Sequence, residues 1–292
     1  MQIVFHIGAH CTDEGKITRA LLRSRSELIK HGVSVPPPRR YRPLIRETLN
    51  ILGGMVATNE VEDLLLETIV EEDGINRVVL LHENLICIPH RAIGEEGLYA
   101  MAARRIAAFA RLFPSHDCEF HLGLCNPATL VPTLAQKAGP DGYEMVMAGA
   151  DVRRLRWLST IENIVQTGFG DRLTLWCNED TPLIWQDVLR SLAGGVGSAV
   201  PLEGDLDLMA ALLNEEGLQL FTEALAKIDP EDREARYELV GQMLASHSGP
   251  GELEIDIDLP DWTSDLVESL TETYIADCAA IAALPGVRFL TP

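Results

Sequence analysis

The sequence has no apolar run long enough to span a bilayer. It also lacks the signal-peptide pattern of a basic segment followed by an apolar stretch near its first residues. A membrane-spanning or exported protein is therefore not expected. The six cysteines are scattered and include no Cys-x-x-Cys pair, so we expect reduced thiols and a cytoplasmic location rather than a disulfide framework. No period repeats along the chain, which excludes a solenoid.

Positive charge is scarce as well. Lys and Arg total 24 against 44 Asp and Glu, giving a formal net charge of −20. A surface this acidic repels nucleic acid and anionic membranes, so neither is an expected partner. Aromatic residues make up only 5%, but 47% of the residues are hydrophobic and 23% are charged, the composition of a globular protein with a substantial core.

Short apolar segments, each followed by a turn and a helical pattern, indicate buried strands at residues 2–7, 77–81, 119–124 and 173–177. Strands that alternate with helices predict an α/β fold with a mainly parallel central sheet flanked by helices. Residues 287–290 are expected either as an added strand or as a short extended tail. Helices are expected over residues 16–31, 42–52, 60–72, 98–113, 127–137 and 181–192, and the proline-rich residues 36–40 are expected to be extended.

After residue 205 the pattern becomes helical, over residues 205–214, 215–227, 231–246 and 261–284. We expect one domain over residues 1–292, with a helical subdomain over 205–284 packed on it. Residues 252–259 alternate acidic and apolar side chains, which predicts an exposed extended segment.

The first expected strand passes through a small-residue turn directly into an amphipathic helix, as a phosphate-binding loop does. Residues 6–12 (HIGAHCT) and 32–36 (GVSVP) resemble the corresponding motifs of the bacterial sulfotransferase family. Residues 122–128 (LGLCNPA) and 78–85 (VVLLHENL) resemble two further blocks of that family. The resemblance covers the first half of the chain best. The residues that match around the loop are His6, Gly8, Ala9, His10, Thr12, Leu21, Arg25, Gly32, Val33 and Pro36.

This resemblance implies a P-loop-type, sulfotransferase-like fold that binds the sulfate donor 3′-phosphoadenosine 5′-phosphosulfate. It implies donor-binding positions at Gly8, Ala9, Cys11, Thr12, Asp13, Glu14, Gly15, Cys125 and Asn126. The family's loop lysine corresponds to Cys11, its phosphate-binding arginine to Cys125 and its serine to Pro132. The family's Gly-Thr-Thr corresponds to residues 13–15. Because these changes remove cations and hydrogen-bond donors and add carboxylates, we expect donor binding to be lost or altered.

Glu83 and His10 are the candidate catalytic residues. The resemblance implies that a carboxylate near Glu83 can deprotonate an acceptor hydroxyl, and Glu83 follows an expected strand at the edge where α/β sheets place their sites. Alternatively, Glu83 caps the next turn by bonding backbone amides. His10 also lies at a strand end, where an imidazole can act as a base or stabilise developing charge.

Three functional hypotheses follow. The first is a sulfotransferase-related binding or regulatory module whose ligand is a small molecule or a protein. The second is an active sulfuryl (or related group) transferase that uses Glu83 or His10 as base and the family's donor as cosubstrate. The third is a metal- or thiol-dependent site at His10, Cys11 and Cys125, although these residues have no metal-binding spacing.

Two further groups of residues each admit two interpretations. Asn178, Glu179 and Asp180 either contact a ligand or cap the helix that follows them. The densest basic cluster either lines the cleft and attracts an anion or neutralises nearby acids; it comprises Arg39, Arg40, Arg42 and Arg46.

Overall fold

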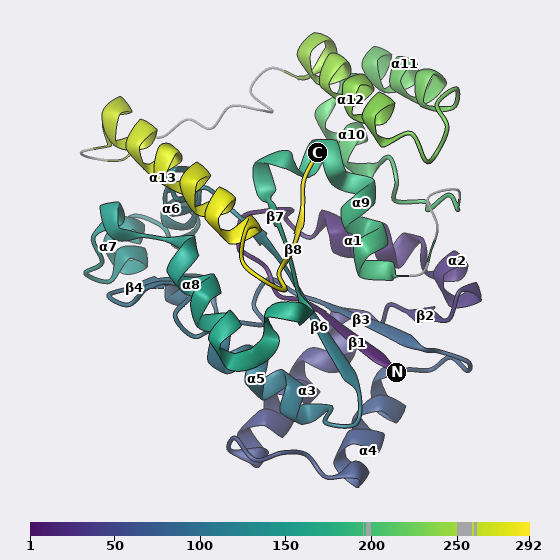
Figure 1. The fold of residues 1–292 in the computed structure, drawn as a ribbon, viewed down its shortest axis with the longest axis vertical. Helices are drawn as coiled ribbons and strands as arrows, with labels where there is room; N and C mark the ends of the chain where they lie inside the picture. The colour runs from purple at the N-terminus through teal and green to yellow at the C-terminus, as the bar shows by residue number, and fades with distance from the viewer. Residues whose placement is uncertain (195, 197–199, 250–258, 260–261) are drawn as a thin grey trace.

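The computed structural model describes residues 1–194, 196, 200–249, 259 and 262–292. In this part of the chain one six-stranded sheet has the order β2-β3-β1-β6-β7-β8, and every neighbouring pair is parallel (Figure 1). Its strands are β1 (Gln2–His6), β2 (Val33–Ser34), β3 (Arg77–Leu81), β6 (Asp117–Leu124), β7 (Leu173–Cys177) and β8 (Arg288–Leu290). The predicted α/β fold with a parallel central sheet is confirmed, and residues 288–290 form a sheet strand rather than a tail. A short antiparallel hairpin joins β4 (Ile93–Gly94) to β5 (Gly97–Leu98).

Alternation along the central strand β1 divides the core into two layers. Ile3 and Phe5 belong to one buried cluster and Val4 to another, because successive side chains of a strand point to opposite faces. The first cluster includes residues of α3 (Pro38–Leu52), α4 (Asn59–Ile69), α5 (Ala102–Leu112), α6 (Pro127–Ala138), α7 (Gly142–Met147), α8 (Trp157–Ile164) and α13 (Ser264–Ala282). The second includes residues of α1 (Lys16–Arg23), α2 (Arg25–Lys30), α9 (Thr181–Ala193) and α10 (Asp207–Leu212).

Several expected boundaries are wrong; for example, α5 begins at Ala102 rather than at residue 98. Two of the differences have identifiable reasons. The helix expected over residues 16–31 is divided at Ser24, whose hydroxyl donates a hydrogen bond to the Ala20 carbonyl oxygen at 2.9 Å and so competes with the helical pattern. Residues 38–40 are helical rather than extended, because Pro38 occupies the first position of α3, where a missing N–H is not needed. The sequence pattern did not indicate α7 or α8.

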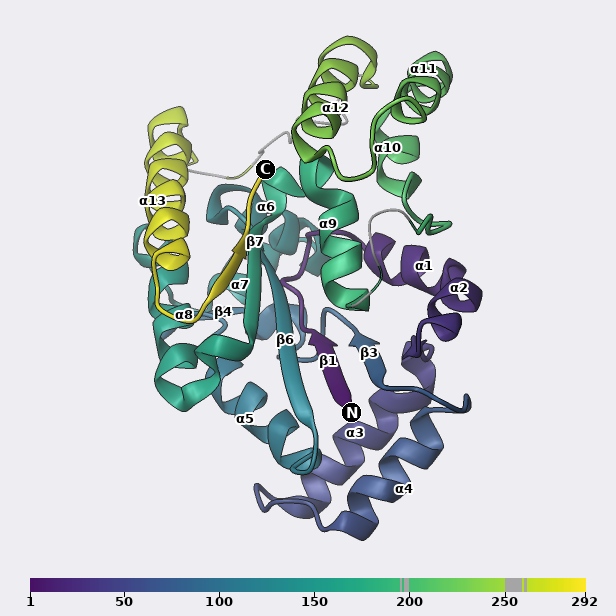
Figure 2. The same ribbon diagram turned by 45° about the vertical axis from the view of Figure 1, so that its right-hand side comes forward.

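The described helices of residues 205–284 lie in two groups (Figures 1 and 2). α10, α11 (Glu215–Leu225) and α12 (Arg233–His247) share a small core of their own, and α12 packs against α9. α13 packs instead against α6 and α8. Residues 252–258 of the expected acidic segment lie outside the described residues. No helix in the described part of the chain is both long and apolar enough to cross a membrane.

Arg77 ties several elements together at the amino ends of the strands. Arg77 is only 5% exposed. Its guanidinium donates to the Glu119 carboxylate on β6 at 2.6 Å and to the Gln2 side chain on β1 at 2.7 Å. It also donates to the backbone carbonyls of Ser191 and Leu192 in α9, at 3.1 and 2.9 Å. One side chain therefore joins β1, β3 and β6 to the end of α9.

Replacing this anchor tests its contribution. Arg77→Met is expected to lower the free energy of unfolding in urea by about 3 kcal/mol, because it leaves Glu119 and two buried carbonyls without their donor. Arg172→Met, at an exposed arginine, is the control and is expected to change stability by less than about 0.5 kcal/mol. Equal losses of unfolding free energy in the two variants would contradict the role of Arg77 as an anchor between the sheet and α9.

Candidate functional site

The loop after β1 lies at the carboxyl edge of the sheet, where ligands of open α/β sheets bind. Backbone pairing with β6 continues into the loop, since the Ala9 N–H donates to the Gly123 carbonyl at 3.0 Å and the Gly123 N–H to the Gly8 carbonyl at 2.9 Å. A Cβ at Gly8, whose φ is +118°, would lie 3.4 Å from the Glu83 carbonyl oxygen. The structure therefore brings the predicted loop and the segment containing Glu83 together.

Asp13 fills the position that an anion would take at the start of α1. Its Oδ2 accepts a hydrogen bond from the Ile17 N–H at 2.8 Å, and its carbonyl oxygen accepts one from the Lys16 N–H at 2.8 Å. The Thr12 hydroxyl turns back and donates to the Ala9 carbonyl at 3.0 Å. A helix N-terminus favours negative charge, and here the chain supplies that charge itself.

Glu14 holds the cations that approach the loop. Lys16 Nζ lies 3.9 Å and Lys137 Nζ 3.5 Å from its carboxylate oxygens. Glu14 is 61% exposed, so each pair contributes little to stability, but together they keep both ammonium groups beside a carboxylate. Cys11 and Glu14 have φ of 58° and 49°, a left-handed conformation that non-glycine residues rarely adopt.

His10 is buried, and both of its ring nitrogens are occupied. Nδ1 lies 2.8 Å from the Tyr99 hydroxyl and Nε2 lies 2.8 Å from Asn84 Oδ1. Asn84 Oδ1 can only accept, so Nε2 carries the ring proton and donates to it, and Nδ1 accepts the proton of the Tyr99 hydroxyl. The Tyr99 oxygen also accepts the His10 backbone N–H at 2.8 Å. Burial lowers the pKa of His10, which keeps the ring neutral. Neither nitrogen is free to accept a proton from a ligand in this arrangement.

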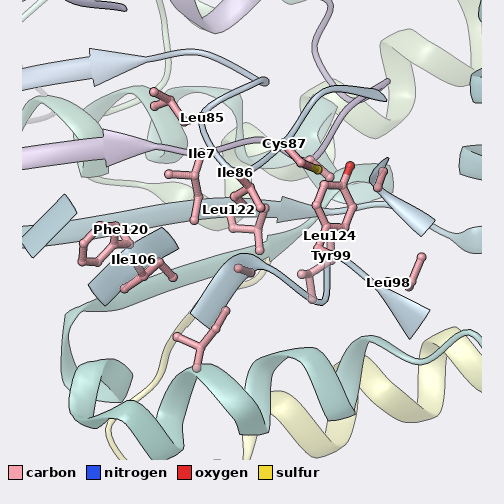
Figure 3. Packing of buried hydrophobic residues seen from close by; sticks show 14 of the residues in the cluster. Ile7, Leu85, Ile86, Cys87, Leu98, Tyr99, Ile106, Phe120, Leu122 and Leu124 are labelled. Atoms are coloured by element: carbon pink, nitrogen blue, oxygen red, sulfur yellow. The ribbon is translucent and has the colours of Figure 1, made fainter. Parts of the chain in front are cut away.

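The surroundings of Tyr99 are apolar and contain the candidate thiols. Figure 3 shows the Tyr99 ring near Cys87 among the buried side chains at this end of the sheet. Burial raises the pKa of Cys11 and, more strongly, that of Cys125, so both are protonated thiols and weak nucleophiles. Within the described residues, no three His, Cys, Asp or Glu side chains are arranged to hold a metal ion.

A second internal carboxylate lies at the start of α6. Glu179 Oε1 accepts the Asn126 N–H at 2.9 Å, and the Tyr274 hydroxyl donates to Glu179 Oε2 at 2.6 Å. The Asn126 side chain accepts the Ala128 N–H at 2.9 Å and so caps α6, the helix that the sequence predicts from residue 127. Asp180, at the start of α9, makes no side-chain cap, so the capping interpretation of residues 178–180 is wrong for that residue.

Glu83 differs from these carboxylates. It is half-buried, and no hydrogen bond or ion pair from the described residues reaches its carboxylate. The expected turn cap is instead made by His82, whose Nδ1 accepts the Asn84 N–H at 2.9 Å, so the capping interpretation of Glu83 is wrong. The negative charge of Glu83 acts on His10 and Cys11, where it opposes the lowered pKa of His10 and adds to the raised pKa of Cys11.

Two residues of this edge were missed by sequence reasoning. Tyr99 reaches the loop from the segment just before α5 and is 89 residues from His10 in the sequence. Lys137 reaches the loop from the last turn of α6. No local pattern marks either residue, because only the packing of distant elements brings them to the loop.

No family model matches the chain, and no curated protein or solved structure does so either. The family resemblance therefore stays a prediction carried by the residues at 6–12, 32–36, 78–85 and 122–128.

Two histidines lie buried side by side beneath the loop, since His6 on β1 pairs with His121 on β6. The His6 ring stacks on Trp176, with ring centroids 5.7 Å apart. His6 Nε2 and both ring nitrogens of His121 have no hydrogen-bond partner among the described residues. Burial lowers the pKa of both rings, that of His121 to about 4.

The sign of the resulting pH dependence follows from linkage. Between about pH 6.5 and 4 the unfolded chain protonates His121 and the folded chain does not, so stability falls as the pH is lowered through this window. In His121→Leu we expect the slope of stability against pH to fall by up to about 1.4 kcal/mol per pH unit. Urea unfolding at a series of pH values measures it, with the exposed His90→Gln as control. A slope unchanged by His121→Leu would contradict the prediction.

Proposed function

We propose that this protein is a sulfotransferase-related α/β protein whose donor loop no longer binds a nucleotide, and that it acts as a binding or regulatory module. One observation carries the proposal: the Asp13 carboxylate accepts the backbone N–H of Ile17 at the start of α1. The resemblance implies that a donor phosphate would approach this same helix end.

Electrostatics make the internal carboxylate an effective block. At an effective dielectric near 20, a phosphate charge about 4 Å from Asp13 is opposed by about 4 kcal/mol. This corresponds to roughly a thousandfold loss of affinity. Cys11 supplies no compensating cation, and Lys16 and Lys137 already face Glu14.

The P-loop-type fold is part of the proposal and is supported by position. The loop connects β1, which lies between β3 and β6, to α1, as a phosphate-binding loop connects its strand and helix. The second helix end at this edge is closed in the same way, because Glu179 accepts the Asn126 N–H. Two filled anion positions and a His10 ring without a free nitrogen favour binding over turnover; the ligand is a small molecule or a protein partner.

Calorimetry with 3′-phosphoadenosine 5′-phosphate tests the proposal. The unmodified protein is expected to give no saturable heat, whereas Cys11→Lys/Asp13→Asn, which changes the local charge by about +2, is expected to gain weak binding. Asp232→Asn is the matched control, since Asp232 caps α12 through the Ala235 N–H at 3.1 Å. Saturable binding by the unmodified protein would overturn the proposal.

A second candidate function rests on the unpaired Glu83. A half-buried carboxylate with no partner among the described residues, at the carboxyl end of β3, has the position of a general base for transfer to a hydroxyl. If this candidate holds, sulfuryl transfer from 3′-phosphoadenosine 5′-phosphosulfate to a panel of alcohols and phenols is detectable. The rate then falls at least about a hundredfold in Glu83→Gln. Absence of transfer across the panel would favour the binding module.

A further inference from the structure

A cavity of about 480 Å³ lies between α3, the segment that follows β3 and the first turns of α5. Its size is in the range of small-molecule sites. The described residues that line it include no Asp or Glu, and its cations are Arg39, Arg42, Arg46, Arg91 and Arg105. Five of the chain's 24 basic residues thus surround one cavity of a protein whose net charge is −20.

Within the described part of the chain, these arginines have no carboxylate partner. The guanidinium groups of Arg39, Arg42, Arg46 and Arg91 make no hydrogen bond or ion pair with the described residues. That of Arg105 uses only its Nε, which donates to the Ile86 carbonyl at 3.2 Å. Like charges collected without counter-ions repel one another, and a bound anion relieves that repulsion.

The arginines of other surfaces behave differently. Arg40, one residue from the cavity lining, bonds Glu71 at 2.5 Å, and Arg23 bonds Asp207 at 2.7 Å. The two interpretations of the basic cluster therefore apply to different members: Arg40 neutralises an acid, whereas its three neighbours line the cavity.

Apart from Asn84, the rest of the lining is largely apolar. Ile45, Leu85 and Phe109 are buried core residues that reach the cavity, and Pro43, Leu49 and Ile88 complete this side. A ligand that fills the site must therefore present both an anionic group and an apolar body.

We propose that this cavity binds a small organic phosphate monoester, with the phosphate on the arginines and the apolar body against Ile45, Leu85 and Phe109. A phosphate dianion matches several guanidinium groups better than a single carboxylate does, because the planar donor fork of arginine bonds two phosphate oxygens at once. The overall charge of −20 opposes a long polyanion, since the surface beyond the cavity repels every further phosphate.

The inference goes beyond the proposed function and does not rest on the loop after β1. The two regions meet at Asn84, which lines the cavity and accepts the hydrogen bond of His10 Nε2. Variants on α3 and variants in the loop therefore test the two proposals separately.

Calorimetric titration of the full chain with phenyl phosphate tests the site. We expect saturable binding that weakens as salt is raised, and that weakens roughly tenfold or more in Arg42→Gln/Arg46→Gln, because charge-assisted hydrogen bonds are lost. Arg40→Gln removes a charge from the same helix outside the cavity lining and is expected to leave binding unchanged. Circular dichroism confirms that each variant is folded.

The same titrations also give the results that would overturn the proposal. Equal affinity in the double variant and the unmodified protein, or no saturable binding of phenyl phosphate, would overturn the site. If inorganic phosphate binds as tightly as phenyl phosphate, the claim that the apolar lining contributes to binding is overturned. If a short single-stranded oligonucleotide binds more tightly than phenyl phosphate, the claim that the ligand is a small molecule is overturned. Failure of the loop proposal appears separately, as nucleotide binding by the unmodified protein that the arginine variants do not weaken.

Discussion

Parallel hydrogen bonding of β1 to β3 on one side and to β6 on the other is the constraint on which the rest of the structure depends. Because β1 is also buried on both faces after Gln2, its register is tied to two layers of helices at once. The carboxyl ends of three strands therefore meet along one edge. The loop after β1, the segment containing Glu83 and the start of α6 converge there although they are far apart in the sequence.

At this edge, carboxylates of the chain itself compensate the positive ends of the helices. Two helix N-termini point toward it, and each has an internal carboxylate on a backbone amide, Asp13 on Ile17 and Glu179 on Asn126. A helix end that is already compensated gains little from an external anion. Glu83 is the exception, since no described residue bonds its carboxylate, and it is therefore the feature that the binding-module proposal leaves unexplained.

The sheet was predictable from the sequence because short apolar segments bounded by turns carry a local pattern, and residues 77–81 and 173–177 were located to the residue. The Asn126 cap was predictable for the same reason. The environment of His10 was not, because its partners come from two other segments and only packing brings Tyr99 to its ring. Capping was the alternative interpretation of Glu83, because carboxylates commonly cap turns, whereas in the structure the neighbouring His82 has that role.

The arginines of this chain occupy two kinds of environment, those paired with a carboxylate and those that line the cavity. Many of the acidic and basic side chains of this chain form ion pairs. Arg77 pairs with Glu119 at the amino ends of the strands, and Arg40 pairs with Glu71 beside the cavity. The arginines around the cavity are the contrast, because no carboxylate of the described residues contacts their guanidinium groups. An acidic surface makes such a group selective, since a small anion reaches it at modest electrostatic cost while an extended polyanion meets repulsion over its whole length. The hydrogen bond from His10 to Asn84 connects this cavity to the closed loop, so an anion that moves Asn84 would change the one contact that fixes the His10 tautomer.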